Sequence, residues 1–345
     1  SRVARKCEAL GMEVRRNDPP LARGVPVRAY SKERLTASLQ TDPKYVPLEA
    51  LYDCDFVTFH TPLTREGIDK TLHLADDGFF SRLKSGAVLV NASRGAVVDS
   101  QALKAVEGAG RLQAVVLDVW EGEPSIDVDL LEKVDLATAH IAGYSFDGKV
   151  AGIIMIYRSL CEHFGLTPKC DVKDFLPAPT VPRLEIETVL GGSGLAEREE
   201  RVIGEGLEEG ESGLYSSTKS RSSISLKNGN DETLDARGSE FRLQAGQDRV
   251  NAELQTDQPF SDRGASDEEL LARIVEKIYS IAQDDRNTRP IASRPAEERG
   301  RFFDALRKNY PVRREFQNTT VVLDRPRESL ARKLRGIGFA VDGDS

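Results

Sequence analysis

The feature that most constrains the fold is a short apolar run at 88–90, which ends directly in the polar segment Asn-Ala-Ser-Arg-Gly at 91–95. Short runs rich in β-branched residues are typical of parallel strands that are buried on both faces. Apolar runs at 113–117 and 134–137 also end in polar loops. Since ligands of such sheets bind at the carboxyl ends of the strands, the sequence predicts an α/β fold, a Rossmann-like doubly wound parallel sheet, with a site at these loops.

Three residues with complementary chemistry follow the three predicted strands. Arg94 follows the first strand, Glu123 the second and His140 the third. A guanidinium binds a carboxylate through two parallel hydrogen bonds, and a histidine that titrates near neutrality accepts the proton of a hydroxyl group. A carboxylate beside that histidine orients the ring and favours its charged form. The three residues therefore fit oxidation of a 2-hydroxy acid, although the spacing alone also fits residues with structural roles only.

The loops after these strands resemble those of the D-isomer-specific 2-hydroxyacid dehydrogenases. The motifs are Asn-Ala-Ser-Arg-Gly-Ala-Val-Val-Asp at 91–99, Leu-Asp-Val-Trp-Glu-Gly-Glu-Pro at 117–124 and His-Ile-Ala-Gly-Tyr at 140–144. A branch of this family that acts on a phosphorylated hydroxy acid is similar in three further segments, at 59–63, 70–74 and 306–310. The resemblance covers residues 1–186 and, more weakly, 268–341.

The resemblance implies a reaction, a cofactor and partners. The reaction is NAD-dependent oxidation of the C2 hydroxyl of 4-phospho-D-erythronate to the 2-oxo acid, in the biosynthesis of pyridoxine 5′-phosphate (vitamin B6). The implied protein is a cytoplasmic homodimer with no nucleic acid or membrane partner. Two alternatives stay open. One is another D-2-hydroxy acid, such as 3-phosphoglycerate, as the substrate, and the other is a noncatalytic protein that senses the cofactor and binds partners.

The resemblance also implies a role for individual residues. His140 takes the hydroxyl proton, Glu123 holds and polarises His140, and Arg94 binds the substrate carboxylate. Residues at cofactor positions are Asp18, Thr61, Ala92, Ser93, Arg94, Asp118 and Gly143. Tyr144 falls on a substrate position, and no metal ligand is expected. His60 and His73 lie in similar motifs, but we assign them no catalytic role.

The start of the sequence departs from the family pattern. Residues 1–11 predict a helix that a glycine ends, and residues 12–16 predict a strand that leads to Asp18. Asp18 fits the acidic residue that accepts hydrogen bonds from the adenosine ribose in dinucleotide folds. The glycine-rich turn expected before such a helix is missing, as is an initiator methionine. We therefore expect a dehydrogenase that lacks its first strand and phosphate-binding loop, and that is inactive without them.

The sequence predicts four parts along the chain. They are an N-terminally truncated NAD-binding domain at 1–146, a returning helix at 147–170, a small α+β C-terminal dimerisation domain at 171–190 and 263–345, and a disordered insertion at 191–262. The insertion is rich in Glu, Gly and Ser and has no apolar periodicity to offset the entropy of ordering it. We expect further elements at 47–52, 55–60, 77–83, 100–107, 148–164, 267–282, 295–307, 319–323 and 329–334.

Composition restricts the partners and the compartment. The formal net charge of -8 and the sequence pI of about 5.3 argue against binding to nucleic acid. No stretch approaches the roughly 18 apolar residues that a membrane-spanning helix needs. The chain has 4 cysteines without metal-like spacing, which favours a reduced, cytoplasmic protein.

Overall fold

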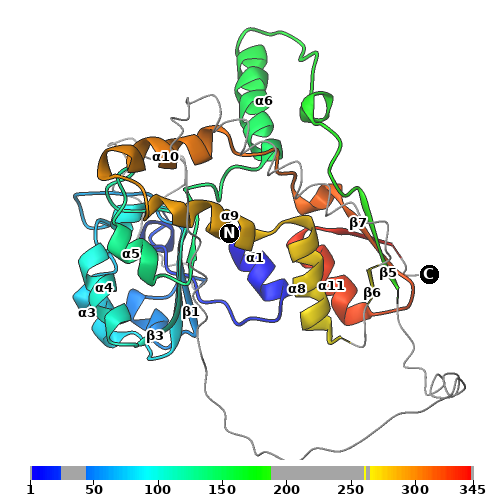
Figure 1. Ribbon diagram of the computed structural model, residues 1–345. Coiled ribbons are helices and arrows are strands. Elements are labelled where there is room, and N and C mark those ends of the chain that lie inside the picture. The colour runs from blue at the N-terminus through cyan, green and yellow to red at the C-terminus, as the bar shows by residue number, and fades with distance from the viewer. Residues whose placement is uncertain (1, 25–43, 188–259, 262–264, 343–345) are drawn as a thin grey trace, which may run out of the picture. The chain divides into compact units, whose positions relative to one another are not determined.

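The computed structural model describes residues 2–24, 44–187, 260–261 and 265–342 (Figure 1). The chain divides into two compact units, one formed by Ser1–Glu187 with Ala265–Ser345 and the other by Thr188–Gly264. Of the second unit, only the strand β6 (Phe260–Ser261) is described. All other described elements belong to the first unit.

One sequence prediction, the disordered insertion at 191–262, falls mainly on residues outside the described part of the chain. Within the described residues, no helix is long and apolar enough to cross a membrane.

The first unit contains a four-stranded parallel sheet, as the sequence predicts. Its strands, in spatial order, are β1 (Phe56–Phe59), β2 (Ala87–Asn91), β3 (Leu112–Leu117) and β4 (Leu136–Ala137). Phe59 lies opposite Asn91, Asn91 opposite Leu117, and Leu117 opposite Ala137. Because the strands are parallel and in register, their carboxyl ends meet at one edge, and the loops that carry the predicted site leave the sheet there.

Short helices connect these strands and pack with them into one apolar core. They are η1 (Leu48–Leu51), α3 (Asp77–Arg82), η2 (Gly95–Val97), α4 (Ser100–Gly108) and α5 (Val128–Lys133), and Figure 1 shows α3, α4 and α5 along the sheet. The side chains of Asp76, Asp99 and Asp127 cap α3, α4 and α5 by accepting backbone N–H bonds in the first turn. Phe79 and Leu103 are fully buried in the core.

Two helices from the C-terminal part of the chain, η4 (Arg289–Ile291) and α10 (Ala296–Lys308), complete the same core. They follow α8 (Asp267–Ile278) and α9 (Ile281–Thr288). Ile291 and Phe303 are fully buried against the core of the first sheet, and α9 contacts β4. The single helix predicted at 267–282 is wrong, because Ser280 interrupts it and caps α9 by accepting a hydrogen bond from Gln283 N. The predicted domain boundaries stay a prediction.

A second parallel sheet lies in the C-terminal part of the first unit. Its strands β5 (Arg183–Glu187), β7 (Thr320–Leu323) and β8 (Ala340–Asp342) are joined with β7 in the middle. Helix α11 (Glu328–Ile337) connects β7 to β8 and packs against α1 (Arg2–Ala9) and α8. A Cβ at Gly336 would lie 2.1 Å from Ala9 Cβ, so the approach of α1 to α11 needs a glycine there. A parallel sheet with helices confirms that this part of the chain mixes helices and strands, and its role as a separate dimerisation domain stays a prediction.

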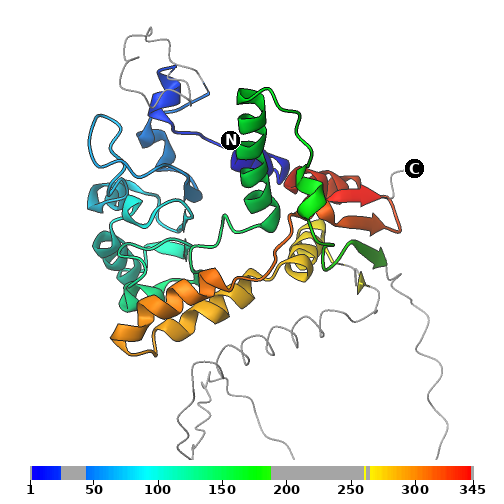
Figure 2. The ribbon, with the colours of Figure 1, turned by 90° about the horizontal axis from the view of Figure 1, so that it is seen from above.

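The remaining described elements are α2 (Pro19–Ala22), α6 (Phe146–His163), η3 (Val172–Phe175) and η5 (Phe316–Asn318). Figure 2 shows α6 beside η3, which it contacts. Ser145 caps α6 by accepting a hydrogen bond from Gly148 N. The strand predicted at 12–16 is wrong. These residues pair with no described strand, and Arg16 O accepts a single bond from Val46 N instead.

Candidate active site

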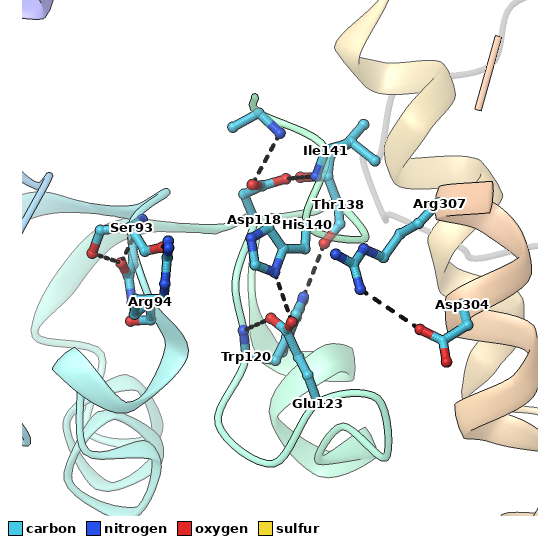
Figure 3. Close-up of polar contacts among 12 residues, drawn as sticks. Ser93, Arg94, Asp118, Trp120, Glu123, Thr138, His140, Ile141, Asp304 and Arg307 are labelled. Atoms are coloured by element: carbon cyan, nitrogen blue, oxygen red, sulfur yellow. Dashed lines mark hydrogen bonds and ion pairs between the residues drawn. The ribbon is translucent and has the colours of Figure 1, made fainter. Parts of the chain in front are cut away.

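His140 and Glu123 form a hydrogen-bonded pair at the carboxyl edge of the first sheet (Figure 3). The Nδ1–H of His140 donates to Glu123 Oε2 over 2.7 Å, because an ionised carboxylate only accepts. The other oxygen of Glu123 accepts from Trp120 N at 2.7 Å, so its orientation is fixed. Nε2 of His140 has no partner among the described residues. The ring is therefore held on one side and available as a proton acceptor on the other.

Asp118 holds the loop that carries His140, which we call the His140 loop (residues 138–144). This buried carboxylate accepts from Thr138 Oγ1 and Ile141 N at 2.7 Å and from Ala142 N at 3.0 Å. The backbone oxygen of Asp118 accepts from His140 N at 2.7 Å. Asp118 thus fixes the backbone on both sides of the histidine. Its predicted contact with the cofactor stays a prediction.

The backbone of His140 lies in the left-handed region, with a φ of 56°. A residue with a Cβ costs about 1–2 kcal/mol in this conformation, so it persists only where its surroundings hold it. The bonds from Asp118 supply part of that restraint. The position of the imidazole therefore depends on the whole loop as well as on Glu123.

Gly95 lets the loop after β2 approach the loop after β3. A Cβ at this position would lie 2.0 Å from the carbonyl carbon and oxygen of Trp120, so no larger residue fits. The Asn-Ala-Ser-Arg-Gly segment therefore packs on the backbone that leads to Glu123. This contact explains why a glycine follows Arg94.

Arg94 is the predicted catalytic residue that the structure does not bring to His140. Its side chain is exposed, and its Nη1 donates to the neighbouring carbonyl of Ser93 at 2.7 Å. Figure 3 shows it apart from the His140–Glu123 pair and turned toward its own loop.

The predicted cofactor residues lie after β1, β2 and β3 and at two further loops. The Thr61 hydroxyl, just past β1, is buried and has no hydrogen-bond partner among the described residues. Ser93 is buried, and its Oγ donates to Asn91 Oδ1 at 3.0 Å, beside Ala92. Gly143 is exposed, with open space where a Cβ would stand. Asp18 caps α2 by accepting from Leu21 N at 3.1 Å.

Tyr144, the predicted substrate contact, lies among positive charges and another aromatic ring. Lys149 Nζ stands 3.8 Å from the centre of its ring, and the Arg307 guanidinium stands 5.8 Å from it. Figure 3 shows Arg307 reaching from α10, where it pairs with Asp304 at 3.6 Å. Tyr310 packs edge-on against Tyr144 with ring centres 5.9 Å apart. This surrounding favours an anionic ligand beside Tyr144.

Two other histidines, His60 and His73, lie in motifs that are similar to the family, and we assign neither of them a catalytic role. His73 also bonds a glutamate, with Nε2 2.7 Å from Glu121 Oε1, and its Nδ1 lies 3.4 Å from Asp99 Oδ2. His60 Nε2 lies 3.0 Å from Thr58 Oγ1, and burial lowers the pKa of His60. Within the described residues, no group of three or more His, Cys, Asp or Glu side chains could hold a metal ion.

A cluster of residues from the C-terminal part of the chain adjoins the His140 loop. The sequence did not indicate this cluster. We call it the Arg313 cluster, and it consists of Tyr279, Asp284, Tyr310 and Arg313. Arg313 Nη2 donates to the carbonyls of Ile141 and Ala142, at 3.0 Å each. Tyr310 belongs to a segment already noted as similar to the family, but no local pattern linked Arg313 to the site.

Comparison with known protein families finds two matches in the chain. Residues 1–142 match the family model described as "D-isomer specific 2-hydroxyacid dehydrogenase, NAD binding domain". Residues 258–338 match a second model, which is described as a domain of unknown function.

The relatives include proteins named erythronate-4-phosphate dehydrogenase. The one from Salinibacter ruber is 50% identical over 165 residues, which are 48% of this chain and 39% of that protein. The one from Citrobacter koseri is 43% identical over 187 residues, which are 54% of this chain and 46% of that protein. The chain thus spans less than half the length of these relatives. A crystal structure of apo D-mandelate dehydrogenase from Rhodotorula graminis is 36% identical over 28% of each chain, with a TM-score of 0.26.

Proposed function

We propose that this chain is the catalytic part of an NAD-dependent dehydrogenase that oxidises 4-phospho-D-erythronate. The product is 2-oxo-3-hydroxy-4-phosphobutanoate, an intermediate on the route to pyridoxine 5′-phosphate. Relatives named erythronate-4-phosphate dehydrogenase support this substrate. The observation that carries the proposal is the His140–Glu123 pair, because it leaves Nε2 of His140 without a partner among the described residues at the carboxyl edge of the sheet.

The proposed chemistry assigns one task to each catalytic residue. Nε2 of His140 accepts the proton of the C2 hydroxyl, and the carboxylate of Glu123 stabilises the imidazolium that forms. Arg94 leaves its bond to Ser93 O and binds the substrate carboxylate through two parallel hydrogen bonds. Tyr144 and the cations around it contact the rest of the anionic substrate.

NAD, when bound, accepts the hydride from C2. The residues that would hold it are those at the ends of β1, β2 and β3, together with Asp18 and Gly143. The buried and unpartnered hydroxyl of Thr61 fits such a role, because a buried polar group without a partner is costly unless a ligand satisfies it. The buried Ser93 hydroxyl and the adjacent backbone at Ala92 offer further polar contacts.

We also propose that the protein is a cytoplasmic homodimer. An exposed apolar stripe runs along one face of α6, and a second copy of the chain would cover it. Its members, which lie three or four positions apart, are Ile153 (68% exposed), Ile156 (66%), Leu160 (52%) and Phe164 (67%). The four cysteines are all unpaired, which fits a reducing compartment. Sedimentation of the chain with Ile156→Glu and Leu160→Glu tests the dimer, and an unchanged mass would contradict it.

A substrate panel tests the proposed activity. Because the chain spans less than half of its relatives, we would assay it alone and also as a chimera. The chimera joins the part of the Salinibacter ruber relative that precedes the matched region to this chain. We expect NADH formation by the chimera with 4-phospho-D-erythronate, and far less with 3-phosphoglycerate or unphosphorylated D-erythronate. A chimera that binds NAD and oxidises none of the three acids would contradict the proposal.

A further inference from the structure

The His140 loop is held from two sides by groups of opposite charge. On one side, the Asp118 carboxylate accepts from the N–H groups of Ile141 and Ala142. On the other side, the Arg313 guanidinium donates to the carbonyls of the same two residues. Each of the two residues that follow His140 thus has both its backbone polar groups bonded to a charged side chain. Asp118 follows β3, whereas Arg313 comes from the region that matches the domain of unknown function.

The backbone of Arg313 adds a second link to the same loop. Arg313 forms an isolated parallel bridge with Ser145, and its carbonyl accepts from Phe146 N at 2.8 Å. The segment around Arg313 therefore runs beside residues 141–146 and contacts them through both its main chain and its side chain. This double attachment fixes where the guanidinium lies relative to His140.

The rest of the Arg313 cluster holds the guanidinium in place. Its carbon lies 4.9 Å from the ring centre of Tyr279 and 5.5 Å from that of Tyr310. Both tyrosine hydroxyls donate to Asp284 Oδ2, at 2.7 Å and 2.8 Å. Burial and the nearby Asp284 raise the pKa of Tyr279 to about 12, so this tyrosine stays a neutral donor at physiological pH. The other residues of the cluster therefore hold the Arg313 guanidinium in one position.

We propose that Arg313 is a positioning residue for the proposed dehydrogenase, and that holding the His140 loop is a function of the domain of unknown function. Arg313 does not touch the reacting atoms. It keeps the peptide groups after His140 in the one arrangement that sustains the left-handed backbone of this residue and aims Nε2 at the substrate. This inference rests on the proposed function for its kinetic consequence, but its structural claim can be measured without turnover.

Arg289 provides a matched control within the same chain. It also comes from the C-terminal part, pairs with a carboxylate, Asp285, and donates to backbone carbonyls next to the first sheet, namely those of Val134 at 2.9 Å and Asp135 at 3.1 Å. None of these carbonyls belongs to the His140 loop. Loss of Arg289 therefore removes the same kind of contact without releasing His140.

The first measurement is amide hydrogen exchange in the 345-residue chain. In Arg313→Met we expect the amides of Ile141 and Ala142 to exchange about 10-fold faster or more, while those of β2 and β3 keep their rates. Arg289→Met should leave Ile141 and Ala142 unchanged. Equal exchange at Ile141 and Ala142 in Arg313→Met and the unsubstituted chain would overturn the proposal. If Arg313→Met does not fold, Arg313→Lys replaces it, because lysine keeps the buried cation but has no planar fork to span two carbonyls.

The second measurement compares how each substitution changes kcat and how it changes KM. It uses whichever protein, the chain alone or the chimera, oxidises 4-phospho-D-erythronate. A small displacement of a catalytic group costs about 10²-fold in rate, so Arg313→Met should lower kcat by roughly 10- to 100-fold and change KM little. Added guanidinium should restore part of the lost kcat in Arg313→Met and none in Arg289→Met. A rise in KM alone, or equal losses in both variants, would contradict a positioning role. If no form oxidises the acid, the proposed function fails, while the exchange result still decides whether Arg313 holds the loop.

Discussion

Two histidines in this molecule look alike in local structure and differ in one decisive contact. His140 and His73 both have a left-handed backbone, with φ values of 56° and 53°, and both bond a glutamate at 2.7 Å. The two glutamates, Glu123 and Glu121, lie two positions apart in the loop after β3. His73, however, has a carboxylate at each ring nitrogen, whereas no residue in the described part of the chain bonds Nε2 of His140. A histidine–carboxylate pair is therefore a candidate base only where the second nitrogen is open.

The strongest test of this comparison exchanges each histidine for alanine. We expect His140→Ala to lower kcat about 10³-fold, since a positioned general base contributes roughly 10²–10⁴-fold. NAD affinity should stay nearly unchanged. His73→Ala serves as the control and should alter kcat less than about 3-fold, because its ring contributes only a half-exposed ion pair. Kinetics on the active form measure both, and a larger loss in His73→Ala would reverse our assignment.

Removal of Asp118, which holds the His140 loop, should also lower the free energy of unfolding. Asp118→Ala leaves three donors without an acceptor, those of Thr138, Ile141 and Ala142, and Thr138 and Ile141 are buried. Because each unsatisfied buried donor costs about 1–3 kcal/mol, we expect a loss of roughly 3 kcal/mol in the free energy of unfolding. Urea denaturation of the chain measures it. Asp129→Ala, which removes a half-exposed carboxylate from α5, is the control and should change stability by under about 0.5 kcal/mol.

The two glutamates offer a finer form of the same test. Glu123→Gln keeps an acceptor for Trp120 N but removes the charge beside His140. A hydrogen bond to a charged group is worth about 1.5–3 kcal/mol, so kcat should fall roughly 10- to 100-fold. Glu121→Gln, at the His73 pair, should leave kcat within about 3-fold of the original. Similar losses in the two variants would mean that the pairs do not differ in function.

A pH-dependent effect on stability should arise from Asp147, which lies directly after the His140 loop. Burial by itself would raise the pKa of Asp147, but hydrogen bonds from Arg314, Glu315 N and Asn318 lower it below the usual value of 3.8. A carboxyl group with a lowered folded pKa stabilises the fold above its unfolded pKa, and this stability is lost as pH falls through the folded value. We expect Asp147→Asn to cost roughly 1.5 kcal/mol at neutral pH.

The difference in the free energy of unfolding between Asp147→Asn and the original chain should become smaller below about pH 4, where the carboxyl group takes up a proton. Thermal unfolding at a series of pH values measures it. The effect arises at the first turn of α6, directly after the His140 loop. If the difference in stability between the two proteins stays constant as the pH is lowered, the charge of Asp147 contributes nothing to the stability of the fold.

Local patterns in the sequence predicted much of the first sheet and its helices. The apolar runs at 88–90 and 113–117 lie within β2 and β3, and the element expected at 100–107 is the helix α4. These signals are short-range, because strand burial and helix capping depend on residues within a few positions of one another. The failures were also local. The strand predicted at 12–16 has no described partner to pair with, and Ser280 divides the helix predicted at 267–282.

The sequence by itself determined the chemical groups of the site: an arginine, a glutamate and a histidine after three apolar runs, in motifs that resemble one family. Only the tertiary structure decided which of them act together. It bonds Glu123 to His140, leaves Arg94 apart, and brings Arg313 to Ile141 across 172 positions of the chain. The physical reason is that a hydrogen bond depends on separation in space, which local periodicity does not encode. The free nitrogen of His140 and the arginine that holds its loop therefore become visible only once the chain is folded.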